Sequence, residues 1–136
     1  MPIEYRIDHE RRIVLAKGRG VFTDQDAFGY QREVWTRPDV AGYHELIDMS
    51  EITSIPLPVA GRVRDLAHLS AGMDGPATPG TKFAIYAPTD ETYGLGRMYQ
   101  TYRELQDGSS KEVGVFRTFD EALAFLGVKR SNSDPR

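Results

Sequence analysis

Three short apolar runs, each followed by a helix start, constrain the fold of this chain more than any other feature. The runs span residues 45–49, 83–87 and 113–116. Runs of this length bounded by turn residues are typical of strands buried on both faces. Pro58 can occupy the first turn of the helix after the first run, because its missing N–H would be unpaired there anyway. Strands that alternate with helices in this way predict right-handed crossovers within one sheet.

The N-terminal segment adds a hairpin and a first helix. Residues 3–7 alternate apolar and polar side chains, as in a half-buried strand, and a polar turn follows at residues 8–11. The second strand, residues 12–21, contains two glycines that indicate a bend or a close backbone approach. Thr23 is the N-cap candidate of a helix that Pro38 closes.

The last two helices carry the clearest helical signals. In the helix that starts near Asp90, apolar residues recur at i, i+3, i+4 and i+7, namely Leu95, Met98, Tyr99, Tyr102 and Leu105. In the final helix Thr118 and Glu121 have the spacing of a capping box, and Gly127 ends the helix. The complete order, ββαβαβαβα, predicts an α/β fold in which a mixed β-sheet carries helices.

Length and composition predict one globular domain. The 136 residues can bury a sizeable core without covalent staples, and one domain is predicted over residues 1–128. Residues 129–136, KRSNSDPR, have no apolar side chain to bury, so this tail is expected to be disordered.

Charge and cysteine content exclude several functions. The net charge of -3 and the scattered lysines and arginines argue against a nucleic-acid partner. Without cysteine there is no disulfide, no thiolate nucleophile and no cysteine-ligated metal. The alternating, charged N-terminus is neither a signal peptide nor a membrane span, so a cytoplasmic location is predicted. No cofactor is predicted.

Two segments then carry a resemblance to a known family. IVLAKGRGVFTDQDAFGY at residues 13–30 and ELIDMSEITSI at residues 45–55, set in this element order, resemble the STAS superfamily and its SpoIIAA-like branch of small single-domain proteins. The likeness covers about residues 3–127. Tyr-Ala-Pro at residues 86–88 and Gly-Leu-Gly-Arg-Met-Tyr at residues 94–99 add to it. The resemblance implies a SpoIIAA-like fold and, from family habit, a homodimer.

The phosphorylation switch of the anti-sigma-factor antagonists in this family is only partly matched. Residues 48–52, Asp-Met-Ser-Glu-Ile, fit the first part of the pattern, but Pro-Leu-Pro at residues 56–58 replaces the Asp-Ser-Ser that contains the acceptor serine. A helix N-terminus suits such a switch because its free N–H groups interact strongly with phosphate. Ser50 and Ser54 remain candidate regulatory acceptors, and a phosphorylation-controlled interaction protein remains an alternative function.

Catalytic and metal-binding sites find weaker support. Ser50, His68 and Asp48 could form a nucleophile–base–acid set, which makes a small hydrolase a second alternative. No Gly-x-Ser-x-Gly elbow accompanies them, and the chain is predicted not to be an enzyme. The three histidines lack the short spacings of metal sites, so no metal site is predicted.

The leading functional prediction is a binding groove between the second and third helices, edged by the Gly/Pro-rich loop at residues 72–80. The glycines at 94 and 96 could cradle a phosphate beside Arg97, but close helix packing explains them better. Several tyrosines together are as expected in an apolar cleft or a dimer interface as in a core. The predicted ligand is a small apolar or amphipathic molecule or a partner protein helix, and the candidate ligand-binding residues are Tyr86, Tyr93, Arg97, Tyr99 and Tyr102.

Overall fold

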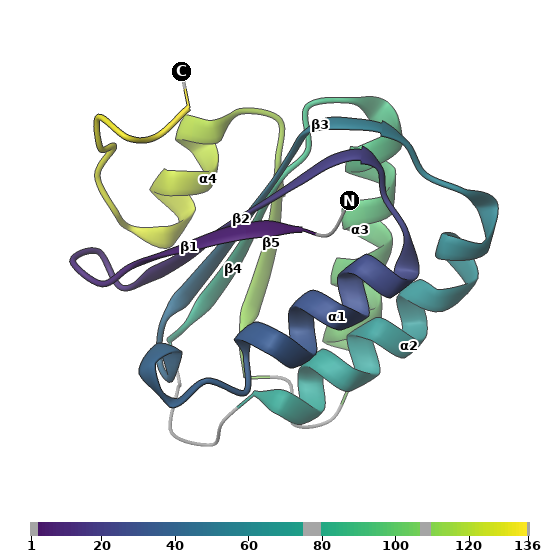
Figure 1. The fold of residues 1–136 in the computed structure, drawn as a ribbon, viewed down its shortest axis with the longest axis horizontal. Coiled ribbons are helices and arrows are strands. Elements are labelled where there is room, and N and C mark those ends of the chain that lie inside the picture. The colour runs from purple at the N-terminus through teal and green to yellow at the C-terminus, as the bar shows by residue number, and fades with distance from the viewer. Residues whose placement is uncertain (1–2, 75–79, 107–109, 136) are drawn as a thin grey trace.

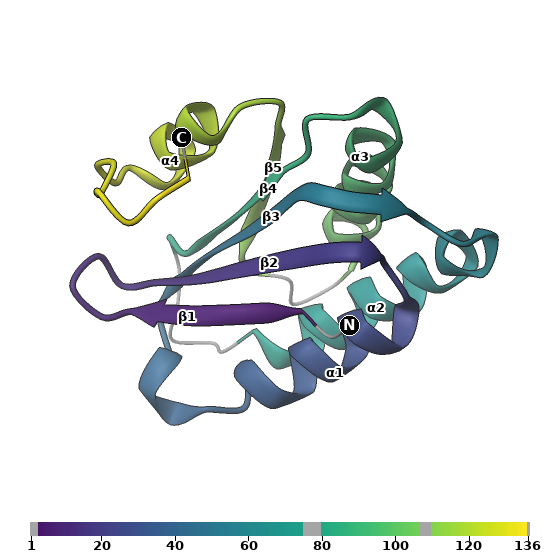
Figure 2. The same cartoon turned by 45° about the horizontal axis from the view of Figure 1, so that its top comes forward.

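A computed structural model of the chain describes residues 3–74, 80–106 and 110–135. Its strands form one five-stranded sheet in the order β1-β2-β3-β4-β5, in which β1 runs antiparallel to β2 and the remaining neighbours are parallel (Figures 1 and 2). The strands are β1 (Glu4–Asp8), β2 (Ile13–Val21), β3 (His44–Ser54), β4 (Lys82–Tyr86) and β5 (Glu112–Phe116). The predicted mixed sheet and the order ββαβαβαβα are confirmed.

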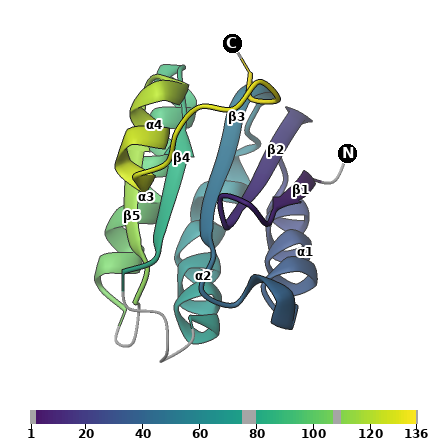
Figure 3. The ribbon, with the colours of Figure 1, turned by 90° about the vertical axis from the view of Figure 1, so that its left-hand side faces the viewer.

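Helices cover the two faces of the sheet unequally. Three helices, α1 (Asp24–Val34), α2 (Leu57–Met73) and α3 (Asp90–Glu104), lie on one face, and α4 (Phe119–Leu126) lies on the other (Figures 1 and 3). A 3-10 turn at Pro38–Val40 links α1 to β3. The described residues contain no helix that is both long enough and apolar enough to cross a membrane.

Local capping fixes the helix starts as the sequence predicts. The Thr23 hydroxyl accepts from the Asp26 N–H at 3.1 Å, and the Thr118 hydroxyl accepts from the Glu121 N–H at 3.2 Å. Gly127 ends α4 in the left-handed conformation, with φ of 74°. These contacts place α1 and α4 at fixed points along the chain.

The central strand β3 is longer than the apolar run predicts. It extends from His44 to Ser54 because β2 continues to pair with it beyond an irregularity between Lys17 and Arg19. A Cβ at Gly18 would lie 3.0 Å from Ile52 Cδ1, so the predicted close approach is found at that glycine. Strand alternation then divides β3, because Ile47 and Met49 belong to the core under α1–α3 whereas Leu46 belongs to the core under α4.

The buried face of α3 differs from the predicted one. Leu105 is 72% exposed and Met98 is 37% exposed, whereas Thr92, Gly96 and Arg103 are buried. The i, i+3, i+4 rhythm locates the helix correctly but does not show which apolar positions reach the sheet. Hydrogen bonds from the buried Arg103 to Tyr99 and Asp74 take the place of the expected apolar contacts near the end of α3.

The C-terminal segment lies against the hairpin, although the sequence predicts disorder there. Asp134 is 6% exposed, and its carboxylate accepts two hydrogen bonds from the Arg11 guanidinium at 2.8 Å. Arg6 donates to the Ser133 hydroxyl at 3.2 Å. These contacts are polar and join residues more than a hundred positions apart, so the missing apolar side chains give no sign of them.

Candidate functional site

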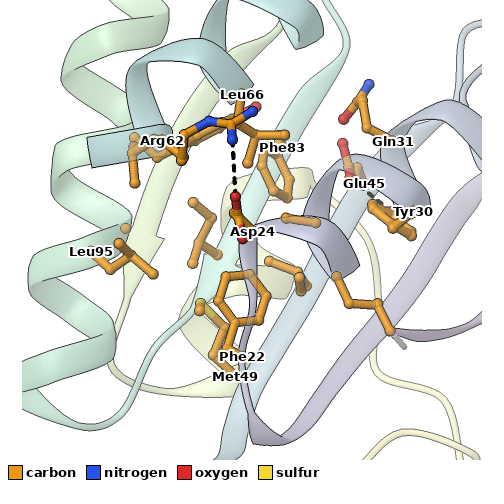
Figure 4. Close-up of a pocket in the computed structure, with 17 residues that line it drawn as sticks. Phe22, Asp24, Tyr30, Gln31, Glu45, Met49, Arg62, Leu66, Phe83 and Leu95 are labelled. Atoms are coloured by element: carbon orange, nitrogen blue, oxygen red, sulfur yellow. Dashed lines mark hydrogen bonds and ion pairs between the residues drawn. The ribbon is translucent and has the colours of Figure 1, made fainter. Parts of the chain in front are cut away.

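A cavity of about 70 Å³ lies between the sheet and helices α1, α2 and α3 (Figure 4). Its walls combine side chains from α1, α2 and α3 with side chains from β3 and β4. Apolar groups dominate the lining: Ile3, Phe22, Ala27, Ile47, Met49, Val63, Leu66, Phe83, Ile85 and Leu95. Such a space attracts the apolar part of a small ligand, because transfer of that part from water is favourable.

An ion pair between α1 and α2 borders this cavity. Arg62 on α2 donates to Asp24 at the start of α1 at 3.2 Å, as Figure 4 shows. Arg62 also lies 5.0 Å from the centre of the Phe28 ring and 3.2 Å from Asp65. Its side chain is half exposed, so this guanidinium can exchange partners with an anionic group in solvent.

A buried carboxylate, Glu45, also lines the cavity. Glu45 is 3% exposed, and its carboxylate accepts hydrogen bonds from the Tyr30 hydroxyl at 2.7 Å and from the Trp35 indole N–H at 3.1 Å. The Lys111 ammonium lies 3.5 Å from the other carboxylate oxygen and 3.2 Å from the centre of the Trp35 ring. Both oxygens of Glu45 are therefore occupied by this chain's own groups.

Burial shifts the titration of the groups around Glu45. It lowers the pKa of Lys111, an effect that the nearby Glu45 carboxylate opposes. Burial also raises the pKa of Tyr30 well above its ordinary value, and the negative charge of Glu45 adds to the effect. Tyr30 therefore stays a neutral donor near neutral pH.

A second group of polar contacts continues this network toward the ends of α2 and α3. Arg103 donates to the Tyr99 hydroxyl at 2.8 Å and to Asp74 at 2.5 Å. The Ser70 hydroxyl donates to Gln31 at 3.1 Å. Since these buried groups bond to one another, they hold α1, α2 and α3 together and leave binding in the cavity to its apolar walls.

The structure does not gather the five predicted ligand-binding residues. Tyr99 lines the cavity, whereas Tyr86 lies on the opposite face of the sheet, with its ring 5.7 Å from that of Phe119. The Tyr93 ring packs under Arg117 at 4.3 Å. Arg97 is exposed on α3, and Tyr102 is half-buried against the core.

The expected surroundings of the groove also change. The cavity lies under α1 as well as α2 and α3, and residues 75–79 of the Gly/Pro-rich loop lie outside the described residues. A Cβ at Gly96 would meet Val115 Cγ1 at 2.9 Å, which supports close packing rather than a phosphate cradle. Around Gly94 there is open space.

The candidate regulatory and catalytic serines lie on a strand and not in the first turn of a helix, although Ser54 comes two residues before Pro56, the N-cap of α2. Both Ser50 and Ser54 belong to β3, and the Ser50 N–H donates to Asp48 at 2.8 Å. His68, on α2, contacts Gln106 at 2.9 Å beyond the end of α3. The nucleophile–base–acid set is therefore not assembled. Among the described residues no group of three acidic, histidine or cysteine side chains could hold a metal ion.

The cavity walls were visible in the sequence only as core positions. Ala27 and Tyr30 have the spacing of one helix face in the sequence of α1, as Val63 and Leu66 have in the sequence of α2. The incomplete filling of the space between these helices depends on their packing over the sheet. A local pattern contains no signal for it.

Comparisons with known proteins identify the fold. No protein-family model matches the sequence, and no curated protein sequence matches it. The structure is similar to the crystal structure of an uncharacterised protein of the DUF3478 family from Shewanella loihica PV-4, which has a SpoIIAA-like fold. The TM-score is 0.58 with 19% sequence identity, over 92% of this chain and 94% of the other. The chain therefore has a SpoIIAA-like fold, and the predicted resemblance is confirmed at that level.

Proposed function

We propose that this protein is a non-catalytic binding module that holds a small apolar or amphipathic molecule in the cavity under α1, α2 and α3. The observation that carries the proposal is an apolar cavity bordered by the Arg62–Asp24 ion pair, in which the arginine side chain is half exposed. Binding sites for small molecules commonly combine an apolar lining with a few polar groups that set orientation. The buried polar groups nearby bond to one another, which favours binding over chemistry.

The size of the cavity limits what can enter. At about 70 Å³ it has roughly half the volume of the ~150 Å³ engineered cavity that accepts benzene. A short or branched alkyl group fits this space, whereas a long acyl chain requires α1 and α2 to separate. The ligand is therefore a compact molecule, or an amphipathic one that inserts only the end of its apolar part.

Arg62 selects the head group of an amphipathic ligand. Its guanidinium is half exposed and already bonds to the Asp24 carboxylate beside the cavity. A ligand carboxylate can replace Asp24 in this pairing while its alkyl part enters between Ala27 and Val63. Short branched-chain carboxylates are therefore the first compounds to test.

Native mass spectrometry of gently purified protein, together with melting temperatures across a panel of short and branched carboxylates, tests the proposal. Retained ligand, or a saturable rise in melting temperature, is expected. Ala27→Leu should abolish the rise because the added side chain fills the cavity. No retained compound and no thermal shift with any compound of the panel would overturn the small-molecule proposal.

The head-group role of Arg62 has a matched control on the same helix. Arg62→Ala should weaken carboxylate binding about tenfold, as expected for loss of one charge-assisted contact. Arg64→Ala removes another exposed α2 arginine that does not line the cavity and should leave binding unchanged. Equal effects of the two substitutions would show that Arg62 acts only through net charge.

A further inference from the structure

A cleft of about 340 Å³ lies on the other face of the sheet, away from the cavity under α1–α3. Strands β1, β2 and β3 form its floor, with Leu15, Leu46 and Asp48 among the floor residues, and Phe119 of α4 adds a wall. Residues 133–135 of the C-terminal segment line it as well. The cleft therefore combines apolar groups with the end of a polar segment.

Asp48 is the incompletely bonded group of this cleft. It is 3% exposed, and its Oδ1 accepts from the Ser50 N–H at 2.8 Å. Its Oδ2 is buried and has no hydrogen-bond partner within the described residues. The Lys17 ammonium lies 3.8 Å from Oδ2, beyond hydrogen-bond distance, and pairs more closely with Glu51. A buried carboxylate oxygen without a donor is unfavourable unless a ligand supplies one.

The neighbouring charges favour a cation as the missing donor. The other carboxylates around the cleft each have a closer cationic partner, as in Glu4–Arg19 at 3.3 Å and Asp134–Arg11 at 2.8 Å. Four cations face five carboxylates in this group, which leaves one negative charge: Arg6, Arg11, Lys17 and Arg19 against Glu4, Asp8, Asp48, Glu51 and Asp134. The carboxylate with the most distant cation is Asp48.

We propose that this cleft is a second ligand site, which binds a primary ammonium carried on a short apolar body. The ammonium donates to Asp48 Oδ2, and Leu15, Leu46 and Phe119 contact the apolar body. A charge-assisted hydrogen bond to a buried carboxylate is stronger than a neutral one, which favours an amine over an alcohol of the same shape. The site lies on the opposite face from the proposed carboxylate site and does not depend on it.

The Ser50 amide is a built-in reporter for this site, because its N–H donates to the same carboxylate. Phenethylammonium chloride is titrated into 15N-labelled protein, and 2-phenylethanol and potassium chloride are the controls. A saturable shift of the Ser50 amide with the amine is expected, at least tenfold tighter than with the alcohol and absent with potassium. No shift at Ser50, or equal shifts with all three compounds, would overturn the proposal.

Two substitutions test the role of Asp48 directly. Asp48→Asn keeps the acceptor for Ser50 but removes the charge, and it should reduce amine affinity at least tenfold. Asp120→Asn changes an exposed carboxylate on α4 outside the cleft and should have no effect. Equal amine affinity in Asp48→Asn and the wild type would contradict the proposal.

Lys17→Gln gives the opposite prediction and keeps the test decisive if Asp48→Asn does not fold. It removes the cation that competes for Asp48. The amine should then bind several-fold more tightly and should raise the melting temperature more than in the wild type. If Lys17 instead swings onto Asp48 in solution and satisfies it, the amine will bind to Lys17→Gln but not measurably to the wild type, and the proposal fails for the native protein.

Discussion

Two buried carboxylates three residues apart on β3 have opposite surroundings. Glu45 faces α1–α3 and is bonded by Tyr30, Trp35 and Lys111. Asp48 lines the cleft on the α4 face, with one amide donor and a lysine at 3.8 Å. Both are 3% exposed, so burial alone does not distinguish them. The difference lies in how many donors the surrounding elements supply.

That difference separates a structural role from an available site. Glu45 joins α1 to the segment before β5, and every bond that it makes comes from this chain. A group of this kind stabilises the packing of elements that local propensity alone does not hold together. Asp48 is positioned by its own strand and leaves one oxygen for another molecule. The same residue class on the same strand therefore serves two purposes.

The largest predicted effect is the loss of stability when Glu45 is substituted. Glu45→Gln leaves the buried Lys111 ammonium without its nearest counter-charge, and the free energy of unfolding should fall by about 3–5 kcal/mol. Asp48→Asn should change it by less than about 1 kcal/mol, because no donor loses its only partner. Urea unfolding of both variants measures the two effects. Equal losses would mean that Asp48 is as much a structural group as Glu45.

Two glycines of α3 test how tightly the face that contains Glu45 is packed. Gly96→Ala places a methyl group 2.9 Å from Val115 Cγ1 and should cost about 1–3 kcal/mol of stability. Gly94→Ala enters open space on the same helix and should stabilise the protein by about 0.5–1 kcal/mol. Thermal unfolding measures both substitutions. A neutral Gly96→Ala would show that the three-helix face is loosely packed, which would also weaken the size limit on the cavity.

The pairing of Asp134 with Arg11 allows the stability of the α4 face to be tested separately from the Glu45 network. Burial by itself would raise the pKa of Asp134, but the hydrogen bonds from Arg11 and from the Ser131 amide hold that pKa below its usual range. A lowered folded-state pKa means that the pairing stabilises the fold above the ordinary aspartate pKa, and that this contribution is lost as the pH falls through the folded value.

Asp134→Asn should therefore cost about 1 kcal/mol at neutral pH and should speed trypsin cleavage at Lys129 and Arg130. Asp120→Asn, which removes an exposed partner of Arg130, is the control for cleavage at that arginine. Unchanged cleavage in Asp134→Asn would show that the pairing does not hold the segment. Contacts of the Glu45 network should not respond in either variant.

Local patterns were enough to predict the order of elements. The period-two alternation of residues 3–7, the Thr23 cap and the Thr118–Glu121 spacing each depend on neighbours within a few positions, and each appears in the structure. One further signal was available. Phe83 and Tyr86 are three positions apart on one strand, so they must point to opposite faces. Strand alternation would have shown that Phe83 and Tyr86 cannot both face one groove, but not which of them does.

The two sites could not be predicted in this way, because they depend on contacts between distant residues. Glu45 and Lys111 are 66 positions apart, and Arg11 and Asp134 are 123 positions apart. No spacing rule links such pairs. The cavity likewise results from the distance between α1 and α2 over the sheet. The sequence shows which side chains are apolar, but it does not show where packing leaves space.

His44, next to Glu45 on β3, gives the smallest predicted effect and tests a third environment on this strand. Burial, together with the charges of Lys82, Lys111 and Arg12, lowers the pKa of His44, and its Nδ1 accepts from the Lys82 N–H at 3.0 Å. Because the unfolded chain then binds a proton more readily than the folded protein, stability is full above about pH 6.5 and falls as the pH drops below it.

His44→Asn retains an acceptor for the Lys82 N–H but does not titrate in this range. It should therefore reduce this loss of stability by roughly a few tenths of a kcal/mol, a small amount because the ring is partly exposed. His68→Asn leaves His44 in place and should retain the loss. Urea unfolding between about pH 7.5 and about pH 5.5 measures this loss of stability. An unchanged pH dependence in His44→Asn would show that the Lys82 contact does not keep His44 neutral.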